Sequence, residues 1–85
     1  MEIVKNNLEL TRTASKIERD VKNQAIQELR RMREEKGWTI SELSCVTGFP
    51  NDTFDRLEIG RKSISLFVIC MMAHVYGKSV RIVFE

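Results

Sequence analysis

The stretch WTISELSCVTGFPNDTFDRLE, residues 38–58, decides the fold. Thr39 and Glu42 form a capping box, in which the threonine hydroxyl accepts a hydrogen bond from the backbone N–H three residues on and the glutamate reaches back to the N–H of the cap. This pattern predicts a short helix over residues 40–47. Gly48 follows directly, and glycine is the residue that most often ends a helix.

A second short helix is predicted over residues 51–58, directly after a tight turn that contains proline. Phe54 and Leu57 occupy its inner face and are expected to pack against the first helix. Trp38 and Leu43 flank the start of that first helix at the positions of a hydrophobic staple, so we expect Trp38 in the core. Two short helices joined by a tight turn with a glycine have the geometry that places the second helix in the major groove of DNA.

An apolar stripe with helical spacing precedes these two helices. Its members recur every three or four residues: Leu10, Ala14, Ile17, Val21, Ala25, Leu29 and Met32. Residues 15–18 form a second capping-box pattern, so the sequence leaves open whether residues 10–36 make one helix or two. We expect at least one helix over residues 20–35, ended by Gly37.

The last third of the chain predicts a helix over residues 64–76, capped by Ser63, and then a short strand over residues 80–84. The helix is apolar nearly all round, which in so small a protein predicts burial against a second chain. A single strand leaves an open edge, and pairing with its symmetry mate or with residues 3–4 would close it. Both features predict a dimer.

Composition sets the class of protein. The 85 residues are 42% hydrophobic and 31% charged, with a net charge of +2, which suits one globular domain and permits a nucleic-acid partner. We divide it into an N-terminal arm or extra helix, residues 1–20, and a domain of residues 21–85. The N-terminus is polar and lacks the apolar run of a signal peptide, and the longest apolar stretch, residues 66–75, is about half as long as a membrane span requires, so we expect a cytoplasmic protein.

The pattern of reactive side chains predicts a protein that is not an enzyme. The sequence offers no nucleophile with an adjacent base, no glycine-rich phosphate loop and no close His or Cys pair. Cys45 and Cys70 are expected to be reduced thiols that act as small hydrophobes, and His74 is expected to be structural. We therefore expect no metal and no cofactor.

The spaced residues of segment 25–76 resemble the Xre/Cro-repressor family. The resemblance rests on Leu29-Arg30, Lys36-Gly37-Trp38-Thr39, Glu42-Leu43, Gly48-Phe49, Thr53-Phe54 and Arg56-Leu57-Glu58-Ile59-Gly60-Arg61-Lys62. It implies an all-α, lambda-repressor-like helix-turn-helix bundle of four to five helices with a short C-terminal β-strand. That strand is similar to the one in the HipB and HigA antitoxin branches, which implies a dimer joined partly through it.

The resemblance assigns base reading to the first turns of the second short helix. There Arg56 suits a guanine, Asn51 an adenine and Asp52 the amino group of a cytosine. It implies phosphate contacts from Thr39, Ser41, Arg61 and Lys62. Glu58 has a structural role in this family, and Arg30 is its expected partner.

The chain departs from the family pattern in several places. Ile40 stands where glutamine is common, which removes one polar DNA contact. Asp52 and Asp55 add negative charge to the reading helix. Pro50 replaces the usual capping serine or threonine, and Ile64 stands where proline is common.

The sequence thus predicts a sequence-specific regulator of double-stranded DNA, most simply a homodimeric repressor. The residues expected to form the dimer are Met71, Met72, Val80, Ile82 and Phe84. One alternative is an antitoxin whose last strand and first 20 residues bind a protein toxin. Another is a helix-turn-helix used only for dimerisation.

The basic run from Arg30 to Lys36 is either a solvated face or a source of phosphate contacts from Arg31 or Arg33.

Overall fold

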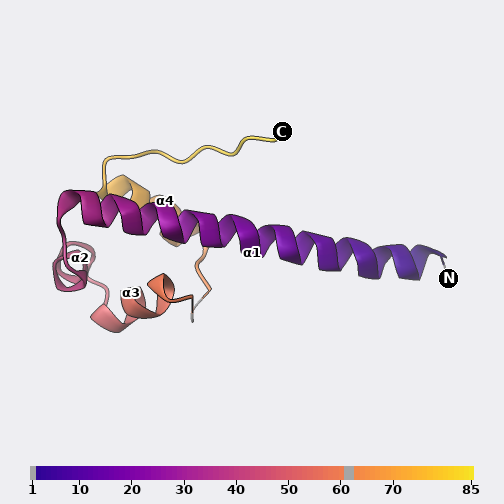
Figure 1. Cartoon of the computed structure of the whole chain (residues 1–85), viewed down its shortest axis with the longest axis horizontal. Helices are drawn as coiled ribbons and strands as arrows, with labels where there is room; N and C mark the ends of the chain where they lie inside the picture. Colours follow the sequence, from indigo (N-terminus) through magenta and orange to yellow (C-terminus); the bar gives the residue numbers. More distant parts are fainter. Residues whose placement is uncertain (1, 61–62) are drawn as a thin grey trace.

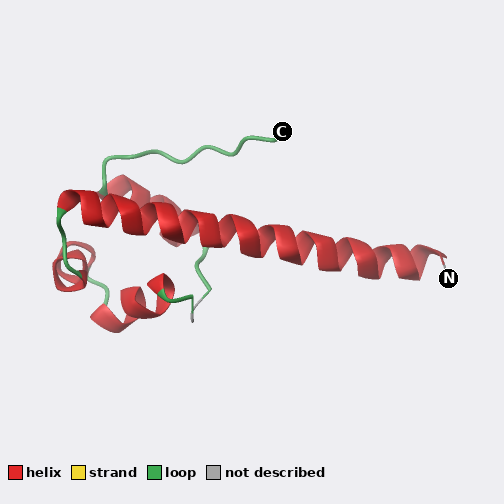
Figure 2. Ribbon diagram, in the orientation of Figure 1, coloured by secondary structure: helices red, strands yellow, loops and turns green. Residues whose placement is uncertain are grey.

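The computed structural model describes residues 2–60 and 63–85, with the side chains of the first helix described from residue 7 onward. It contains four helices (Figure 1): α1 (Glu2–Lys36), α2 (Ile40–Thr47), α3 (Asn51–Glu58) and α4 (Leu66–Val75). Figure 2 shows that the regular structure in these two segments is helical throughout. The expected all-α class is therefore confirmed.

Helix α1 settles the question that the sequence left open, because it runs unbroken for 35 residues. The capping-box pattern at residues 15–18 lies inside it. The helix ends at Gly37, whose φ of +71° places it in the left-handed region. The N–H of Trp38 donates to the carbonyl of Arg33 at 3.1 Å and that of Gly37 to Glu34 at 3.0 Å, the hydrogen bonds of a Schellman motif.

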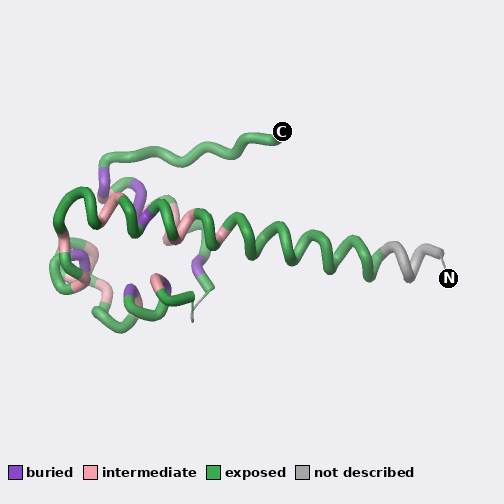
Figure 3. The backbone as a smooth tube through the Cα atoms, viewed as in Figure 1, coloured by how far each residue is buried: buried purple, intermediate pink, exposed green. Residues whose placement is uncertain are grey.

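The N-terminal half of α1 projects beyond the other helices, and the molecule measures 53 × 27 × 17 Å (Figure 1). The division expected between residues 20 and 21 falls within this helix. Of the apolar stripe, only Leu29 is buried, whereas Leu10, Ile17 and Val21 are 68%, 57% and 56% exposed. Figure 3 shows the same change from an exposed half to a partly buried half.

The core lies where the C-terminal half of α1 meets the other helices. Helix α1 packs against α3 and α4, and α2 packs against α3. The buried residues of this core are Leu29, Leu43, Phe54, Leu57, Ile64, Met72, Ala73 and Tyr76. Trp38 packs against them, as its position beside the α2 cap predicts. Met72, which we expected in a dimer contact, is only 4% exposed within the single chain.

Helix α4 starts later than the sequence predicts. Its cap is Ser65, which accepts a hydrogen bond from the N–H of Val68 at 3.2 Å, rather than Ser63. Ile64 between the two serines is buried in the core. Ser63 instead accepts a hydrogen bond from Lys22 Nζ at 3.3 Å, which places the segment before α4 beside the middle of α1.

The prediction of a strand over residues 80–84 is not confirmed by this structure. Residues 78–85 are exposed and have no regular secondary structure. A strand is held by hydrogen bonds to a neighbouring strand, and the described part of the chain offers none. The backbone of this tail therefore faces water.

Candidate nucleic-acid interface

Helix α2 begins at the cap that the sequence predicts. The side chain of Thr39 accepts a hydrogen bond from the N–H of Glu42 at 3.1 Å. The returning contact differs from the expected one, because the Thr39 hydroxyl donates to Glu42 Oε1 at 3.3 Å. Thr39 and Ser41 are both exposed at this end of α2, where unpaired N–H groups favour an anion such as a DNA phosphate.

The turn between α2 and α3 is held by backbone and side-chain hydrogen bonds. Gly48 has φ +79°, and its N–H donates to the carbonyl of Ser44 at 2.8 Å. The Ser44 hydroxyl donates to the carbonyl of Phe49. Thr47 Oγ1 donates to the carbonyl of Leu43 at 2.9 Å. These contacts fix the direction in which the chain enters α3.

Helix α3 is anchored by its inner face. Phe54 and Leu57 are 0% and 4% exposed, and the Phe54 ring lies 6.1 Å from that of Phe49 in the preceding turn. Pro50 occupies the cap position and supplies no side-chain hydrogen bond. The polar residues of the helix are exposed on its other face: Asn51, Asp52, Asp55 and Arg56.

The structure brings the three residues expected to read bases into two contacts. Arg56 Nε lies 3.0 Å from Asp52 Oδ2, in an ion pair whose side chains are 60% and 69% exposed. Asn51 Nδ2 donates to the hydroxyl of Ser41 at 3.2 Å, which joins the start of α3 to the start of α2. The outer face of α3 and the N-terminal end of α2 therefore form one continuous polar surface.

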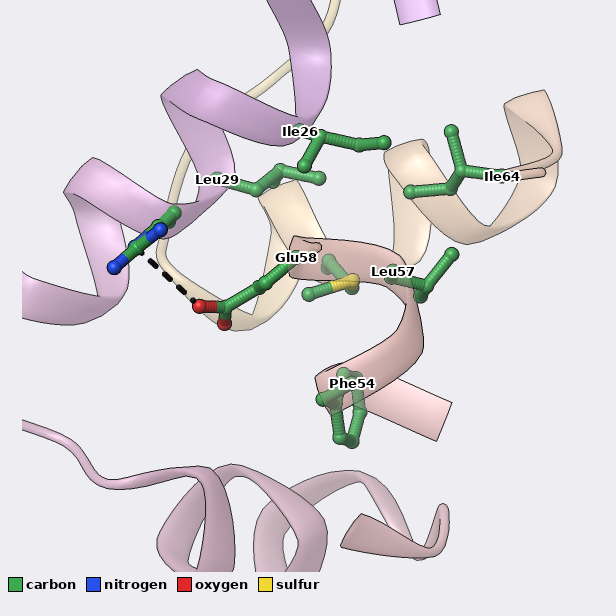
Figure 4. Close-up of a pocket in the computed structure, with 8 residues that line it drawn as sticks. Ile26, Leu29, Phe54, Leu57, Glu58 and Ile64 are labelled. Atoms are coloured by element: carbon green, nitrogen blue, oxygen red, sulfur yellow. Dashed lines mark ion pairs between the residues drawn. The ribbon is translucent and has the colours of Figure 1, made fainter. Parts of the chain in front are cut away.

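Glu58 ties α3 to α1 through two arginines, the expected Arg30 and the closer Arg33. Arg33 binds it with two hydrogen bonds, Nε to Oε2 at 2.8 Å and Nη2 to Oε1 at 2.9 Å. Arg33 Nη1 also donates to the carbonyl of Trp38 at 2.6 Å. Arg30 forms a second, longer ion pair with the same carboxylate, with its Nε 3.6 Å from Glu58 Oε1 (Figure 4).

The Arg33–Glu58 pair is largely shielded from water, since the two side chains are 13% and 14% exposed. The hydrogen bond from Arg33 to Glu58 raises the pKa of the Arg33 guanidinium above its usual value. Both Arg30 and Arg33 lie on the side of α1 that faces α3, so the sequence spacing alone did not separate them.

The remaining residues expected to contact DNA or a second chain differ in their surroundings. Arg31 is held by Glu28 Oε2 at 2.7 Å and by Glu35, so it does not extend toward α3. Arg61 and Lys62 lie outside the described residues. Of the expected dimer residues, Met71 packs against the core, whereas Val80, Ile82 and Phe84 of the tail are 40%, 70% and 94% exposed.

The two cysteines differ from expectation. Cys45 and Cys70 are free thiols, and both are exposed rather than packed as small hydrophobes. His74 is also exposed.

Comparison with known families agrees with this geometry. A family model described as a helix-turn-helix domain matches residues 27–80, which include α2, α3, α4 and residues 27–36 of α1. The chain belongs to the helix-turn-helix family. Comparisons with curated proteins and with solved structures find no significant match.

The helix-turn-helix assignment indicates DNA binding and transcription regulation. The match begins at residue 27, so the projecting half of α1 lies outside it. In the described segments, no helix has the length and apolar character that a membrane crossing requires.

Proposed function

We propose that this helix-turn-helix protein is a sequence-specific regulator of double-stranded DNA that acts as a homodimeric repressor, within the Xre branch of the family. The observation that carries the proposal is the surface of α3. Phe54 and Leu57 anchor the helix in the core, while Asn51, Asp52 and Arg56 face water beside the start of α2. The proposed role is binding, with no catalytic step.

The dimensions of α3 suit a major groove. An α-helix with its side chains is about 10–12 Å in diameter, which fits the major groove of B-DNA, about 12 Å wide. Arg56 has the guanidinium that bonds guanine with two hydrogen bonds, and Asn51 has the amide that does so with adenine. Thr39 and Ser41, which are exposed at the start of α2, are proposed to contact the phosphates that flank the groove.

The exposed apolar residues support the homodimer. Phe67 in the first turn of α4 is 73% exposed, and Ile82 and Phe84 in the tail are 70% and 94% exposed. A second copy would cover such side chains and would give residues 80–84 the strand partner that one chain lacks. Two recognition helices related by a two-fold axis read a palindrome whose half-sites lie about 34–36 Å apart.

Selection of bound sequences from random duplex DNA tests this function. We expect an enriched palindrome, and an affinity for the selected duplex that falls steeply as salt rises, because phosphate contacts release counterions. Weak binding at low salt without any enriched sequence would contradict the proposal. In that case the acidic residues of α3 would prevent this helix from reading bases.

A second candidate function, an antitoxin similar to the HipB and HigA branch, is favoured by the two parts of the chain that lie outside the core. The projecting half of α1 and the tail of residues 78–85 both expose apolar side chains that a toxin could bind. Purification of the tagged chain from its host tests this candidate. A stoichiometric toxin-like protein encoded beside it would support the antitoxin, and isolation of the chain alone would count against it.

A further inference from the structure

We propose that the projecting half of α1 is a DNA-backbone arm, in which Arg12, Lys16 and Arg19 contact phosphates beyond the base pairs that α3 reads. The inference rests on the proposed DNA-binding function and adds a second contact surface to it. This surface lies outside residues 27–80, the part of the chain that the family model matches.

The helical spacing places these cations on the side of α1 that faces α3. Arg12 and Arg19 are seven residues apart, and Arg19 and Arg30 are eleven apart. At about 3.6 residues per turn these separations are close to two and three whole turns. Arg12, Arg19 and Arg30 therefore lie along one line of the helix. Arg30 identifies the side, because its Nε lies 3.6 Å from Glu58 of α3. Lys16 fills the interval between the two arginines.

The three cations are exposed and available to a partner. In the segments that the structure describes, none of them forms an ion pair, although Glu9 and Asp20 lie nearby in the sequence. Other cations of the same helix are neutralised. Lys22 lies 3.5 Å from Glu18, and Arg31 is held between two glutamates.

The apolar stripe lies on the opposite side of the arm. Leu10 precedes Arg12 by two residues, and Ile17 precedes Arg19 by two, which is about 200° around a helix. A partner that covers Leu10, Ile17 and Val21 would therefore leave the basic side open. The partner that fits a row of unpaired cations next to a recognition helix is the phosphate backbone of the same duplex.

The arm can reach that backbone. Packed helices lie about 8–10 Å apart, and a recognition helix enters a groove about 8.5 Å deep. The phosphates beside the groove therefore rise to about the level of α1, within reach of long arginine and lysine side chains. At about 1.5 Å per residue, Arg19 and Arg12 lie about 16 and 27 Å along the axis from Arg30.

The test compares two double variants with the same change in net charge. Arg12→Gln with Arg19→Gln removes two cations from the arm, and glutamine keeps a similar helix propensity. Arg31→Gln with Lys78→Gln removes two cations elsewhere. The affinity of each variant for the selected palindrome and for a random-sequence duplex is measured by fluorescence anisotropy at a series of salt concentrations.

We expect the arm variant to reduce the slope of log affinity against log salt by about 1.8 per protomer, at about 0.9 for each phosphate that is no longer neutralised. It should weaken binding to both duplexes equally and leave their affinity ratio unchanged, because phosphate contacts carry no sequence information. The control variant should keep a slope close to that of the wild type. Arg12→Lys with Arg19→Lys should restore the wild-type slope.

Two results would overturn the arm, and they are distinguishable from failure of the proposed function. If the wild type selects a palindrome but the arm variant keeps its salt slope, the arm is wrong and the recognition helix stands. If the arm and control variants reduce the slope equally, the effect is one of net charge and the arm is again wrong. A wild type that selects no sequence and shows no salt-dependent binding would overturn both.

Discussion

Asp52 and Arg56 form an exposed ion pair on the face of α3 that is proposed to meet DNA, with Nε and Oδ2 3.0 Å apart. Exposed pairs of this kind are worth about 0–1 kcal/mol, so the pair opens at little cost when a base competes for the guanidinium. Asp52 then orients Arg56 in the free protein and repels phosphates that approach out of register. If α3 reads bases as proposed, this repulsion favours base-specific over non-specific contacts.

Arg56→Ala tests this assignment at the level of one side chain. We expect the preference for one base pair in each half-site to relax, at a cost of about 1–3 kcal/mol, because one guanine loses its two hydrogen bonds. Competition binding with the selected palindrome and its single-base variants measures the effect. An unchanged preference at every position would show that α3 does not read bases through Arg56.

The hydroxyl of Tyr76 is buried in the core without a hydrogen-bond partner among the described residues. The side chain is 5% exposed, its ring lies 5.7 Å from that of Trp38, and its Oη has no hydrogen-bond partner in the described part of the chain. Burial raises the pKa of Tyr76 to about 12. Because the unfolded value is about 10, the unfolded chain releases this proton first, so the free energy of unfolding falls as pH rises from about 10 through 12.

Tyr76→Phe should therefore stabilise the protein. It keeps the ring and removes a buried, unpaired hydroxyl, so we expect the free energy of unfolding at pH 7 to rise by about 1 kcal/mol. The variant should also lose stability less steeply than the wild type above about pH 10. Urea unfolding at neutral pH and across the alkaline range measures both effects, and a variant less stable than the wild type at neutral pH would refute the account.

At the scale of elements, the Arg33–Glu58 pair joins the last turn of α3 to α1, and Arg33 also binds the carbonyl of Trp38 before α2. One side chain thus connects three elements around the recognition helix. The orientation of α3 relative to α1, and with it the alignment of the proposed arm, depends on this contact.

Glu58→Gln should lower the free energy of unfolding by about 2–3 kcal/mol, because it leaves the shielded Arg33 cation without its carboxylate. Arg30→Gln is the matched control. Arg30 is 55% exposed and 3.6 Å from the same carboxylate, so its loss should cost less than about 1 kcal/mol. Chemical denaturation measures the free energy of unfolding of both variants. Equal losses of stability would show that Arg33 is not the main partner of Glu58.

At the scale of the whole molecule, an 85-residue chain leaves large apolar side chains exposed on α1, α4 and the tail. Small domains bury a limited fraction of their surface, and a second copy increases it. Helices of the length of the projecting half of α1 are also only marginally stable in water without a partner. These features make the homodimer the expected state in solution.

Light scattering at micromolar concentration should give twice the 9.9 kDa mass of one chain. Ile82→Asp with Phe84→Asp should shift the protein to a monomer without unfolding it, because both residues are exposed in the protomer. Val83→Asp, on the other face of the predicted strand, should leave the dimer intact. A monomeric wild type, or a double variant that remains dimeric, would contradict dimerisation through the tail.

The sequence by itself determined the local parts of this protein. The cap at Thr39, the ends of α1 and α2 at Gly37 and Gly48, and the inward position of Phe54 and Leu57 depend on hydrogen bonds and periodicity within a few residues. For this reason α2, α3 and the exposed polar face between them were predicted where the structure has them. The family match at residues 27–80 follows the same local pattern.

Only the tertiary structure decided what depends on distant partners. It made α1 one helix across residues 15–18, added Arg33 to Arg30 as the closer partner of Glu58, and placed Met72 in the core. It left residues 80–84 without the strand that their β-branched pattern favours. In each case the local sequence is compatible with two outcomes, and the side chains and backbone groups that lie within reach in the folded chain select one of them.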